Sequence, residues 1–276
     1  MTRDYLVELL KAYWFAPPVA LWRAVELRAA SAPCQSVERP LLDLGCGDGL
    51  IGEILFGRQG GVDVGLDPWT HQVRQAAGLD AYHHVDRGAG RALPYPDRGF
   101  ATVFSNSVLE HIADLEPVLE EVGRVLRPGG RFIFTVPSDA FRRMLDGYAR
   151  RMTAGDPEGA EAYAARVDER LEHHHYHTPQ EWTELLGEAG LSVIQSSYYM
   201  PQPLERFWDR MNARYGIGDH GSIWSLLVSP RLRPLGYQRL LRHLVVKHLG
   251  DSWRPTYEMD VQPGNKGGGL LIVAER

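Results

Sequence analysis

Apolar residues recur along the chain in two alternating patterns. Short apolar runs, with the length and composition of strands buried on both faces, are separated by segments whose apolar residues return at helical spacing. This alternation is typical of an α/β fold, in which helices cover a mainly parallel sheet. The predicted strands lie at residues 41–44, 62–66, 81–85, 100–105, 131–137, 191–199 and 268–275.

The helical segments have recognisable starts and stops. A Thr-Pro pair at 178–179 supplies an N-cap and a first helical residue, and a glycine at 190 follows the last helical residue. An Arg-Pro-Gly-Gly turn at 127–130 stops an earlier amphipathic segment. The predicted helices lie at residues 1–30 (broken at the two prolines 17 and 18), 50–56, 114–126, 138–172 and 179–189, with another starting near 69.

A glycine-rich loop follows the first predicted strand, in the sequence PLLDLGCGDGLIG at 40–52. Gly45, Gly47 and Gly49 alternate with other residues, which allows a sharp turn and lets a ligand lie against bare backbone. The helix that follows directs free N–H groups and a partial positive charge at such a ligand. A dinucleotide fingerprint would need a further glycine where Leu50 stands, so the pattern differs from that of NAD-binding enzymes.

The spacing Asp43-x-Gly45-x-Gly47-x-Gly49 resembles motif I of the class I S-adenosylmethionine (SAM)-dependent methyltransferases. The run over 93–138, which includes SNSVLEHI and LRPGGRFIFTVPS, is similar almost throughout to the methyltransferase type-11 family. The resemblance implies a Rossmann-like, seven-stranded sheet of order 3-2-1-4-5-7-6. In that fold the last strand is antiparallel, helices cover both faces, and here a helical insertion precedes the last strand. It also implies SAM as cofactor and S-adenosylhomocysteine as its product.

Several polar residues fall where strands of such a sheet end, which is where ligands bind. Asp67 lies 20 residues after Gly47, the distance at which a carboxylate meets a ribose diol, and it can also cap the next helix. Asp43 suits the cationic sulfonium and amino group of SAM. The resemblance places an adenine-binding acid near Gly88, and the nearest acid here is Asp86. The predicted cofactor residues are Asp43, Gly45, Cys46, Gly47, Gly49, Asp67, Pro68, Trp69, Asp86, Asn106 and Ser107.

Composition narrows the class of protein. The 276 residues carry a formal net charge of −5, which does not favour general nucleic-acid binding. The two cysteines, Cys34 and Cys46, do not make a disulfide framework, and this fits a reducing cytoplasm. No apolar targeting segment is visible near the start, and the longest charge-free stretch there is too short to span a bilayer. We therefore expect a cytoplasmic protein, with peripheral contact at the inner membrane face as an alternative.

Four histidines, at 173, 174, 175 and 177, invite a metal interpretation. Adjacent histidines in an extended segment point in opposite directions, so few of them converge on one ion, and we expect no metal site. General-base catalysis is the more natural role, because imidazole titrates near neutral pH. His111, in the LEHI sequence, is either a base or a group that holds its loop by hydrogen bonds. The candidate catalytic residues are His111, His175 and His177.

Three segments are expected as additions to one methyltransferase domain that spans the chain. They are an N-terminal helical cap (1–38), a substrate-covering insertion (138–177) and a basic, aromatic-rich insertion (200–267). The aromatic stripe of the cap either completes the core or closes a substrate pocket.

The basic insertion holds ten Arg and Lys, among them Arg233, against six acids, among them Asp219, so its charge is +4 and that of the remainder −9. A helix from Leu235 to Leu249 would place basic residues on one face. Its other face would hold Leu240, Leu241, Leu244, Val245 and Leu249. This helix is either a lid packed on the core or a contact with an anionic membrane surface.

The function that these patterns favour is SAM-dependent transfer of a methyl group to a small-molecule or lipid-linked acceptor. Displacement at a sulfonium is a direct SN2 reaction that mainly requires alignment of the reacting atoms. Two alternatives remain at this point: an NAD-dependent oxidoreductase, and a SAM-binding protein without transfer activity. The sequence leaves open the acceptor, its methylated atom and the oligomeric state.

Overall fold

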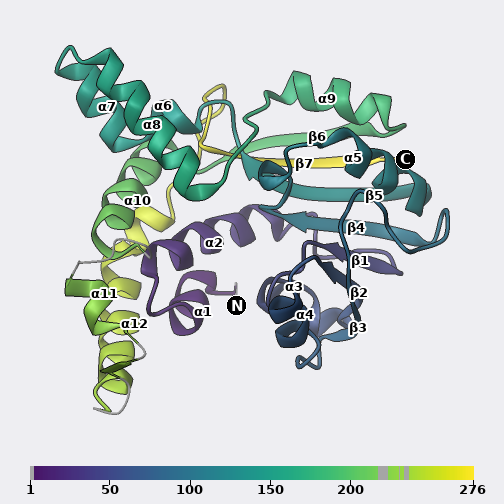
Figure 1. Ribbon diagram of the computed structural model, residues 1–276, viewed down its shortest axis with the longest axis horizontal. Helices are drawn as coiled ribbons and strands as arrows, with labels where there is room; N and C mark the ends of the chain where they lie inside the picture. The colour runs from purple at the N-terminus through teal and green to yellow at the C-terminus, as the bar shows by residue number, and fades with distance from the viewer. Residues whose placement is uncertain (1–2, 217–222, 230, 233–235) are drawn as a thin grey trace. The chain divides into compact units, whose positions relative to one another are not determined.

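A computed structural model describes residues 3–216, 223–229, 231–232 and 236–276. Asp219, Arg233 and Leu235, which the sequence analysis assigns to the basic insertion, lie outside these residues. Within the described chain one sheet has the strand order β3-β2-β1-β4-β5-β7-β6, as Figure 1 shows. The strands are β1 (Leu41–Leu44), β2 (Val62–Asp67), β3 (Tyr82–Arg87), β4 (Phe100–Asn106), β5 (Leu126–Pro137), β6 (Ser192–Tyr199) and β7 (Gly269–Glu275).

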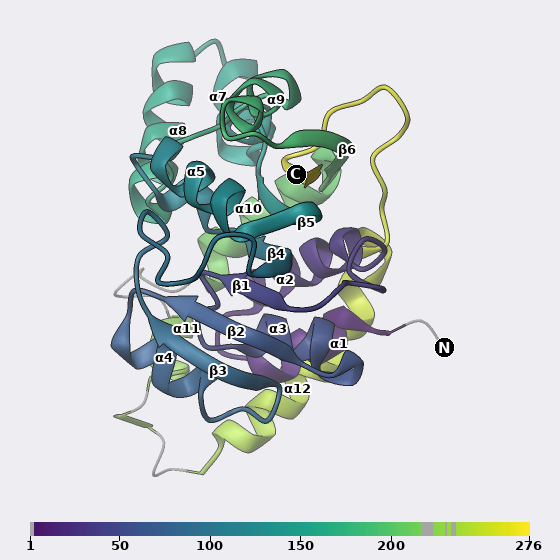
Figure 2. The same ribbon diagram turned by 90° about the vertical axis from the view of Figure 1, so that its right-hand side faces the viewer.

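The strand directions match those of a Rossmann-like sheet. β1 pairs in parallel with β2 and β4, β2 with β3, and β4 with β5. β7 pairs antiparallel with β5, from Arg131 opposite Glu275 to Pro137 opposite Gly269. Figure 2 shows the parallel strands side by side. The predicted fold class, with its strand order and antiparallel last strand, is confirmed.

The helices connect the strands close to their predicted positions. Thr178 caps α9 in a capping box with Glu181, as the Thr-Pro signal predicts. α5 begins two residues later than predicted, and β5 begins at Leu126, before the predicted strand. The helices are α1 (Tyr5–Ala12), α2 (Pro17–Ala30), α3 (Leu50–Phe56), η1 (Gly57–Gln59), α4 (Thr70–Ala76), η2 (Leu109–His111), α5 (Glu116–Val125), α6 (Phe141–Met144), α7 (Asp146–Thr153), α8 (Pro157–Leu171), α9 (Pro179–Glu188), α10 (Gln202–Tyr215), α11 (Ile223–Leu227) and α12 (Gln238–Tyr257).

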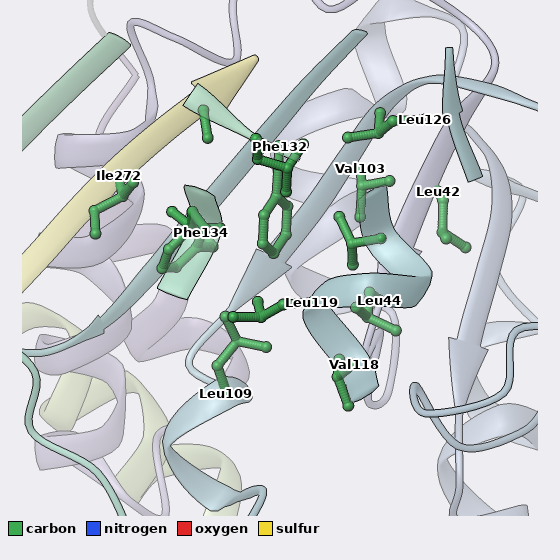
Figure 3. Packing of buried hydrophobic residues seen from close by; sticks show 14 of the residues in the cluster. Leu42, Leu44, Val103, Leu109, Val118, Leu119, Leu126, Phe132, Phe134 and Ile272 are labelled. Carbon is green, nitrogen blue, oxygen red and sulfur yellow. The ribbon is translucent and has the colours of Figure 1, made fainter. Parts of the chain in front are cut away.

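One face of the sheet packs its main apolar core against α5 and α9. Val103 and Phe132 from neighbouring strands meet Leu119 of α5 in this core, shown in Figure 3. The ring of Trp182 on α9 lies edge-on to Phe134, with ring centroids 4.9 Å apart. Each such fully buried side chain contributes about 1.5–3 kcal/mol, so this face fixes the strands that carry the site.

The opposite face of the sheet is covered by α3. Successive strand residues point to opposite faces, so Phe104 faces away from the core that holds its neighbour Val103. Phe104 instead meets Phe56 of α3, with ring centroids 5.2 Å apart. Helices therefore cover both faces, as predicted.

The chain divides into two compact units. The sheet unit comprises Ala29–Asp139, Asp168–Tyr198 and Gly269–Arg276. The helical unit comprises Met1–Arg28, Ala140–Val167 and Tyr199–Gly268. Most of the three segments expected as separate additions thus belong to one unit. That the chain acts as a single methyltransferase domain, with these segments covering the substrate, stays a prediction.

An aromatic cluster forms part of the core of the helical unit. The Trp22 and Trp208 rings have centroids 4.9 Å apart, and Phe141 lies edge-on to Trp22 at 5.6 Å. Trp208 Nε1 donates a hydrogen bond of 3.0 Å to Pro18 O, so the buried indole is satisfied. Residues from all three segments therefore supply one core within this unit.

The prediction of which residues form the apolar face of the helix in the basic insertion is wrong in part. α12 continues through Pro255 to Tyr257 and packs on α1. Its buried stripe follows i, i+4 spacing and includes Val245, Trp253 and Tyr257. Leu240 and Leu244, which were predicted on that face, are 62% and 41% exposed. No helix among the described residues is long and apolar enough to cross a membrane.

Candidate functional site

The glycine loop is held against the end of β2 by its own backbone. The N–H groups of Gly45 and Cys46 both donate to Leu66 O, at 2.8 and 3.0 Å. Gly45, Gly47 and Gly49 all have positive φ, at 76°, 56° and 82°. Residues with a β-carbon rarely adopt this conformation, so the alternation of glycines is what lets the loop fold this way.

The three glycines have different surroundings, which show where glycine is needed for packing and where it leaves room for a ligand. A β-carbon on Gly45 would lie 2.5 Å from Val108, and one on Gly49 would lie 2.9 Å from Ala76 and Tyr82. A β-carbon on Gly47 would meet nothing within 4 Å. Gly47 therefore presents bare backbone to open space, as a loop that holds a ligand must.

Asp67 at the end of β2 fixes the top of this loop. Its Oδ2 accepts from Gly47 N at 3.0 Å, and its Oδ1 accepts from Trp69 N at 2.9 Å. The residue is 6% exposed. A carboxylate has about four acceptor positions, so these two bonds leave capacity for the hydroxyl groups of a ribose. The structure assigns the N-cap position of α4 to Trp69 and not to Asp67.

Asp43 lies under the loop, 3% exposed, and accepts a 2.5 Å hydrogen bond from the hydroxyl of Tyr82. Burial raises the pKa of Asp43 from 3.8 to about 7; the Tyr82 hydrogen bond opposes this, and the charge of Asp67 adds to it. Gly52 makes the pair possible, because a β-carbon there would lie 2.0 Å from the Tyr82 hydroxyl. Sequence reasoning missed Tyr82, because nothing in a strand sequence shows which tyrosine will face a carboxylate.

The end of β4 lies at the same edge of the sheet. Asn106 is buried, and its Oδ1 accepts from Thr135 Oγ1 at 3.1 Å. Ser107 has a φ of 49°, rare for a residue with a side chain, and its N–H donates to Thr135 O at 2.9 Å. The parallel strands β1, β2 and β4 thus bring their carboxyl ends together, as the sequence predicts for Asp43, Asp67 and Asn106.

The remaining cofactor candidates differ in exposure. Trp69 is 66% exposed and Pro68 is exposed, so both are accessible at the end of β2. Asp86 accepts from Tyr95 Oη at 3.0 Å and lies 2.8 Å from His84 Nε2. Cys46 is buried beside Gly65, and burial raises the pKa of its thiol, which disfavours a nucleophilic role.

The histidine candidates gather around the loop that follows β4. His111 Nδ1 lies 3.1 Å from Glu172 O, and His175 Nε2 lies 2.7 Å from Ile112 O. The rings of His175 and His177 stack with centroids 5.2 Å apart. Burial lowers the pKa of His177, and the charge of His175 lowers it further. His111 and His175 each contact a backbone carbonyl, which suits loop positioning, and base catalysis stays a prediction.

Comparison with known proteins matches this architecture. A family model described as a methyltransferase domain matches residues 42–134. The chain is 31% identical over 174 residues to a ubiquinone biosynthesis O-methyltransferase of Azorhizobium caulinodans, covering 61% of this chain and 64% of that protein. It is 30% identical over 199 residues to the enzyme of the same name from Mesorhizobium japonicum, covering 66% of this chain and 73% of that protein. This chain belongs to the class I SAM-dependent methyltransferases.

The match covers only part of the length of these relatives, so their activities are not assigned to this chain by similarity alone. The chain spans slightly less than two thirds, 64–66%, of the first curated relatives. Among solved structures, a geranyl diphosphate C-methyltransferase from Streptomyces coelicolor has a TM-score of 0.54 at 16% identity, covering 94% of this chain and 84% of that one. That similarity supports the fold.

SAM is the cofactor of this family, and the residues at the sheet edge fit it. Gly47 offers bare backbone, Asp67 has acceptor capacity for hydroxyl groups, and Asp43 puts a carboxyl group beneath the loop. A dinucleotide pyrophosphate would instead be repelled by the two carboxyl groups. The loop also has Leu50 where the dinucleotide fingerprint requires a glycine. The NAD-dependent alternative is therefore not favoured.

Proposed function

We propose that this methyltransferase transfers a methyl group from SAM to a small-molecule or lipid-like acceptor by direct SN2 displacement. The observation that carries the proposal is the open space over Gly47 beside the Asp67 carboxylate, at the carboxyl edge of a methyltransferase sheet. When bound, SAM supplies an electrophilic methyl group on a sulfonium. The protein then has to orient that methyl group and exclude water.

The named relatives support the acceptor class. They include the ubiquinone biosynthesis O-methyltransferases and a botryococcene C-methyltransferase of Botryococcus braunii, which is 35% identical over 98 residues. Ubiquinone precursors and botryococcene are both lipid-like. We therefore favour an acceptor with a hydrocarbon chain, and leave its methylated atom open.

The candidate residues outside the glycine loop have the following proposed roles. The carboxylate of Asp67 accepts hydrogen bonds from the ribose hydroxyl groups, and Trp69 with Pro68 flanks the adenosine. Asn106 and Ser107 offer polar groups at the end of β4. Asp86 is the candidate for the adenine amino group. One of His111, His175 and His177 is the candidate base where the acceptor carries a proton.

Calorimetry with SAM, S-adenosylhomocysteine and NAD tests the cofactor assignment. We expect binding of the first two and none of NAD. A transfer assay with radiolabelled SAM then compares a catechol carrying a short prenyl chain with the same catechol without it. Labelling of the prenylated compound alone supports a lipid-like acceptor. SAM binding without transfer to any of a panel of oxygen, nitrogen and carbon acceptors would favour a non-catalytic SAM-binding protein.

We further propose that the helical unit contacts an anionic membrane surface. Leu226 and Leu227 on α11 and Leu240 and Leu244 on α12 are exposed, and we call them the leucine patch. Tyr237 Oη donates to Leu227 O at 2.5 Å, which joins the end of α11 to the start of α12. Residues 236–250 contain no acid and include the exposed cations Arg239, Arg242 and Lys247.

Exposed leucines with cations around them suit the interface of an anionic bilayer, where each nearby cation contributes about 1 kcal/mol. Co-sedimentation with phosphatidylglycerol vesicles should be strong at low salt, fall steeply at high salt and be absent with phosphatidylcholine. Leu240→Glu should abolish it. Ile194→Glu, at a residue 52% exposed in the sheet unit, should not. Equal loss in both variants, or no binding at low salt, would leave this surface as a solvated face.

A further inference from the structure

Glu110, His111 and His173 come together from two distant parts of the sheet unit. Glu110 and His111 lie on η2, directly after β4, and His173 follows α8. The two loops are joined by a 2.8 Å hydrogen bond from His174 N to Glu110 O. One ligand atom from each of the three side chains lies within 4.8 Å of the others. The cluster is therefore built by tertiary structure and not by the run of histidines.

The hydrogen bonds of the two rings fix which nitrogen carries the proton in each neutral ring. Glu172 O can only accept, so His111 Nδ1, at 3.1 Å, must carry the proton. The lone pair of the neutral ring is then on Nε2. That atom lies 3.9 Å from Glu110 Oε1.

His173 is oriented in the same way by a relay of two side chains. Tyr176 Oη donates to Asp168 Oδ1 at 2.5 Å, so its oxygen accepts from His173 Nδ1 at 3.0 Å. The lone pair of neutral His173 is thereby also on Nε2. A histidine that ligates a metal usually donates its other ring N–H to a carbonyl or carboxylate, which sets its tautomer and basicity. Both histidines have this outer partner, His173 through a tyrosine.

We propose that Glu110, His111 and His173 bind one divalent transition-metal cation of the zinc type. Two imidazoles and one carboxylate are a donor set of open, catalytic zinc sites, and imidazole disfavours Mg²⁺ and Ca²⁺. Ligands about 2.1 Å from a tetrahedral ion lie about 3.4 Å apart, so separations within 4.8 Å need a small closing movement. The buried Glu110, 2% exposed, supplies the negative charge. The proposal replaces the sequence expectation of no metal.

The site lies three residues after Ser107, at the sheet edge that carries the cofactor candidates, so its chemistry bears on the acceptor. This step rests on the proposed function. A hydroxyl oxygen of the acceptor bound to the cation would lose its proton to water, and its electron pair would form the bond to the methyl carbon of SAM. The bond from that carbon to sulfur would break, and S-adenosylhomocysteine would leave as the thioether. The cation lowers the pKa of the bound hydroxyl, as it does for bound water.

Cobalt titration of the full-length, chelator-treated protein tests the site without relying on activity. We expect a visible absorption band that saturates at one Co²⁺ per chain and is displaced by Zn²⁺. Glu110→Gln and His173→Asn should weaken binding at least 100-fold, since loss of an outer partner alone costs about 10–100-fold. Asn at 173 keeps an amide nitrogen near the position of Nδ1. Tyr176→Phe should weaken binding about 10–100-fold.

The neighbouring, exposed histidine provides the matched control, because it lies in the same run but outside the cluster. His174→Asn should bind cobalt as the parent does. No saturable band in the parent, or parent-like binding by both ligand variants, would overturn the proposal. Calorimetry with SAM on the same preparations reports folding and the proposed function separately. Intact SAM binding without cobalt binding refutes the metal site alone.

Discussion

The Tyr82→Phe substitution would remove one oxygen atom from the buried pair beneath the glycine loop. The ring of Tyr82 also packs against Gly49 and Gly65, and phenylalanine keeps those contacts. What is lost is the 2.5 Å hydrogen bond to Asp43, a residue 3% exposed. The variant therefore measures how strongly the hydroxyl stabilises that carboxyl group.

The expected loss depends on pH, because the two forms of Asp43 accept hydrogen bonds of different strength. A bond between neutral groups contributes about 1 kcal/mol, and one to a charged group about 1.5–3 kcal/mol. Burial raises the pKa of Asp43 in the folded protein to about 7. We expect Tyr82→Phe to destabilise the protein by about 1 kcal/mol at pH 5.5. At pH 8.5 the loss should be about 2 kcal/mol.

In the parent protein, the free energy of unfolding should itself fall with pH because of Asp43. Asp43 ionises near 3.8 in the unfolded chain and near 7 in the fold, so the folded state binds more protons between these values. Its contribution to stability is fully present below 3.8 and is lost as pH rises through 7. A pKa raised from 3.8 to about 7 corresponds to about 4 kcal/mol of folding free energy. Because Tyr82 lowers this pKa, Tyr82→Phe extends the slope to higher pH.

Urea unfolding of the parent and the variant at pH 5.5 and 8.5, without cofactor, is the assay. Tyr95→Phe is the matched control, since its hydroxyl donates to Asp86, whose side chain is 33% exposed. That control should cost less than about 1 kcal/mol at both pH values. An equal loss at both pH values in Tyr82→Phe, or a loss no larger than that of the control, would contradict the ionisation of Asp43 between pH 5.5 and 8.5.

Three further predictions concern the cofactor loop and the helical unit. Gly47→Val should abolish SAM binding in calorimetry, whereas Gly129→Val, which has a φ of 72° and equal open space, should cost stability and retain binding; binding by the first variant would move the cofactor elsewhere. Asp67→Asn should weaken SAM binding about 10- to 100-fold, since hydrogen bonds to a charged group contribute about 1.5–3 kcal/mol; an unchanged Kd would remove the ribose role. Glu205 is fully buried, and its carboxyl oxygens have no hydrogen-bond partner among the described residues. Burial and the charge of Asp209 raise its pKa, so its stability contribution is lost as pH rises. Glu205→Gln should raise the urea midpoint more at pH 8.5 than at pH 5.5, and the opposite order would show that the carboxyl is not neutral.

The sheet could be predicted from the sequence because its signals are local. Each buried strand is a short apolar run, and the glycines at 45, 47 and 49 mark the one turn that needs positive φ repeatedly. The strand order came from resemblance and not from periodicity. The observed start of a strand differs from the predicted one where the strand extends beyond its apolar run. β5 does so, because it already begins at Leu126.

Features that depend on contacts between distant residues could not be predicted. Tyr82 and Asp43 are 39 residues apart, and His173 is more than 60 residues from Glu110. The sequence shows the run of histidines, but the approach of His173 to Glu110 is made only by the fold. For α12, the pattern around Leu240 gave an apolar face, but the buried stripe follows Trp253 and Tyr257, where the helix meets α1.

The strand order has a consequence for how the protein is made. β7 lies between β5 and β6, and it is the last strand in the sequence. A ribosome that has finished β6 has therefore produced a sheet with a gap, whose flanking edges present unpaired backbone groups. The first helix waits almost as long, since Asp4, its N-cap, pairs with Arg254 at 2.5 Å. Neither unit can complete its packing during most of synthesis, because the helical unit needs residues 199–268 and the sheet unit needs residues 269–276. Both units therefore expose aggregation-prone surfaces until late in synthesis.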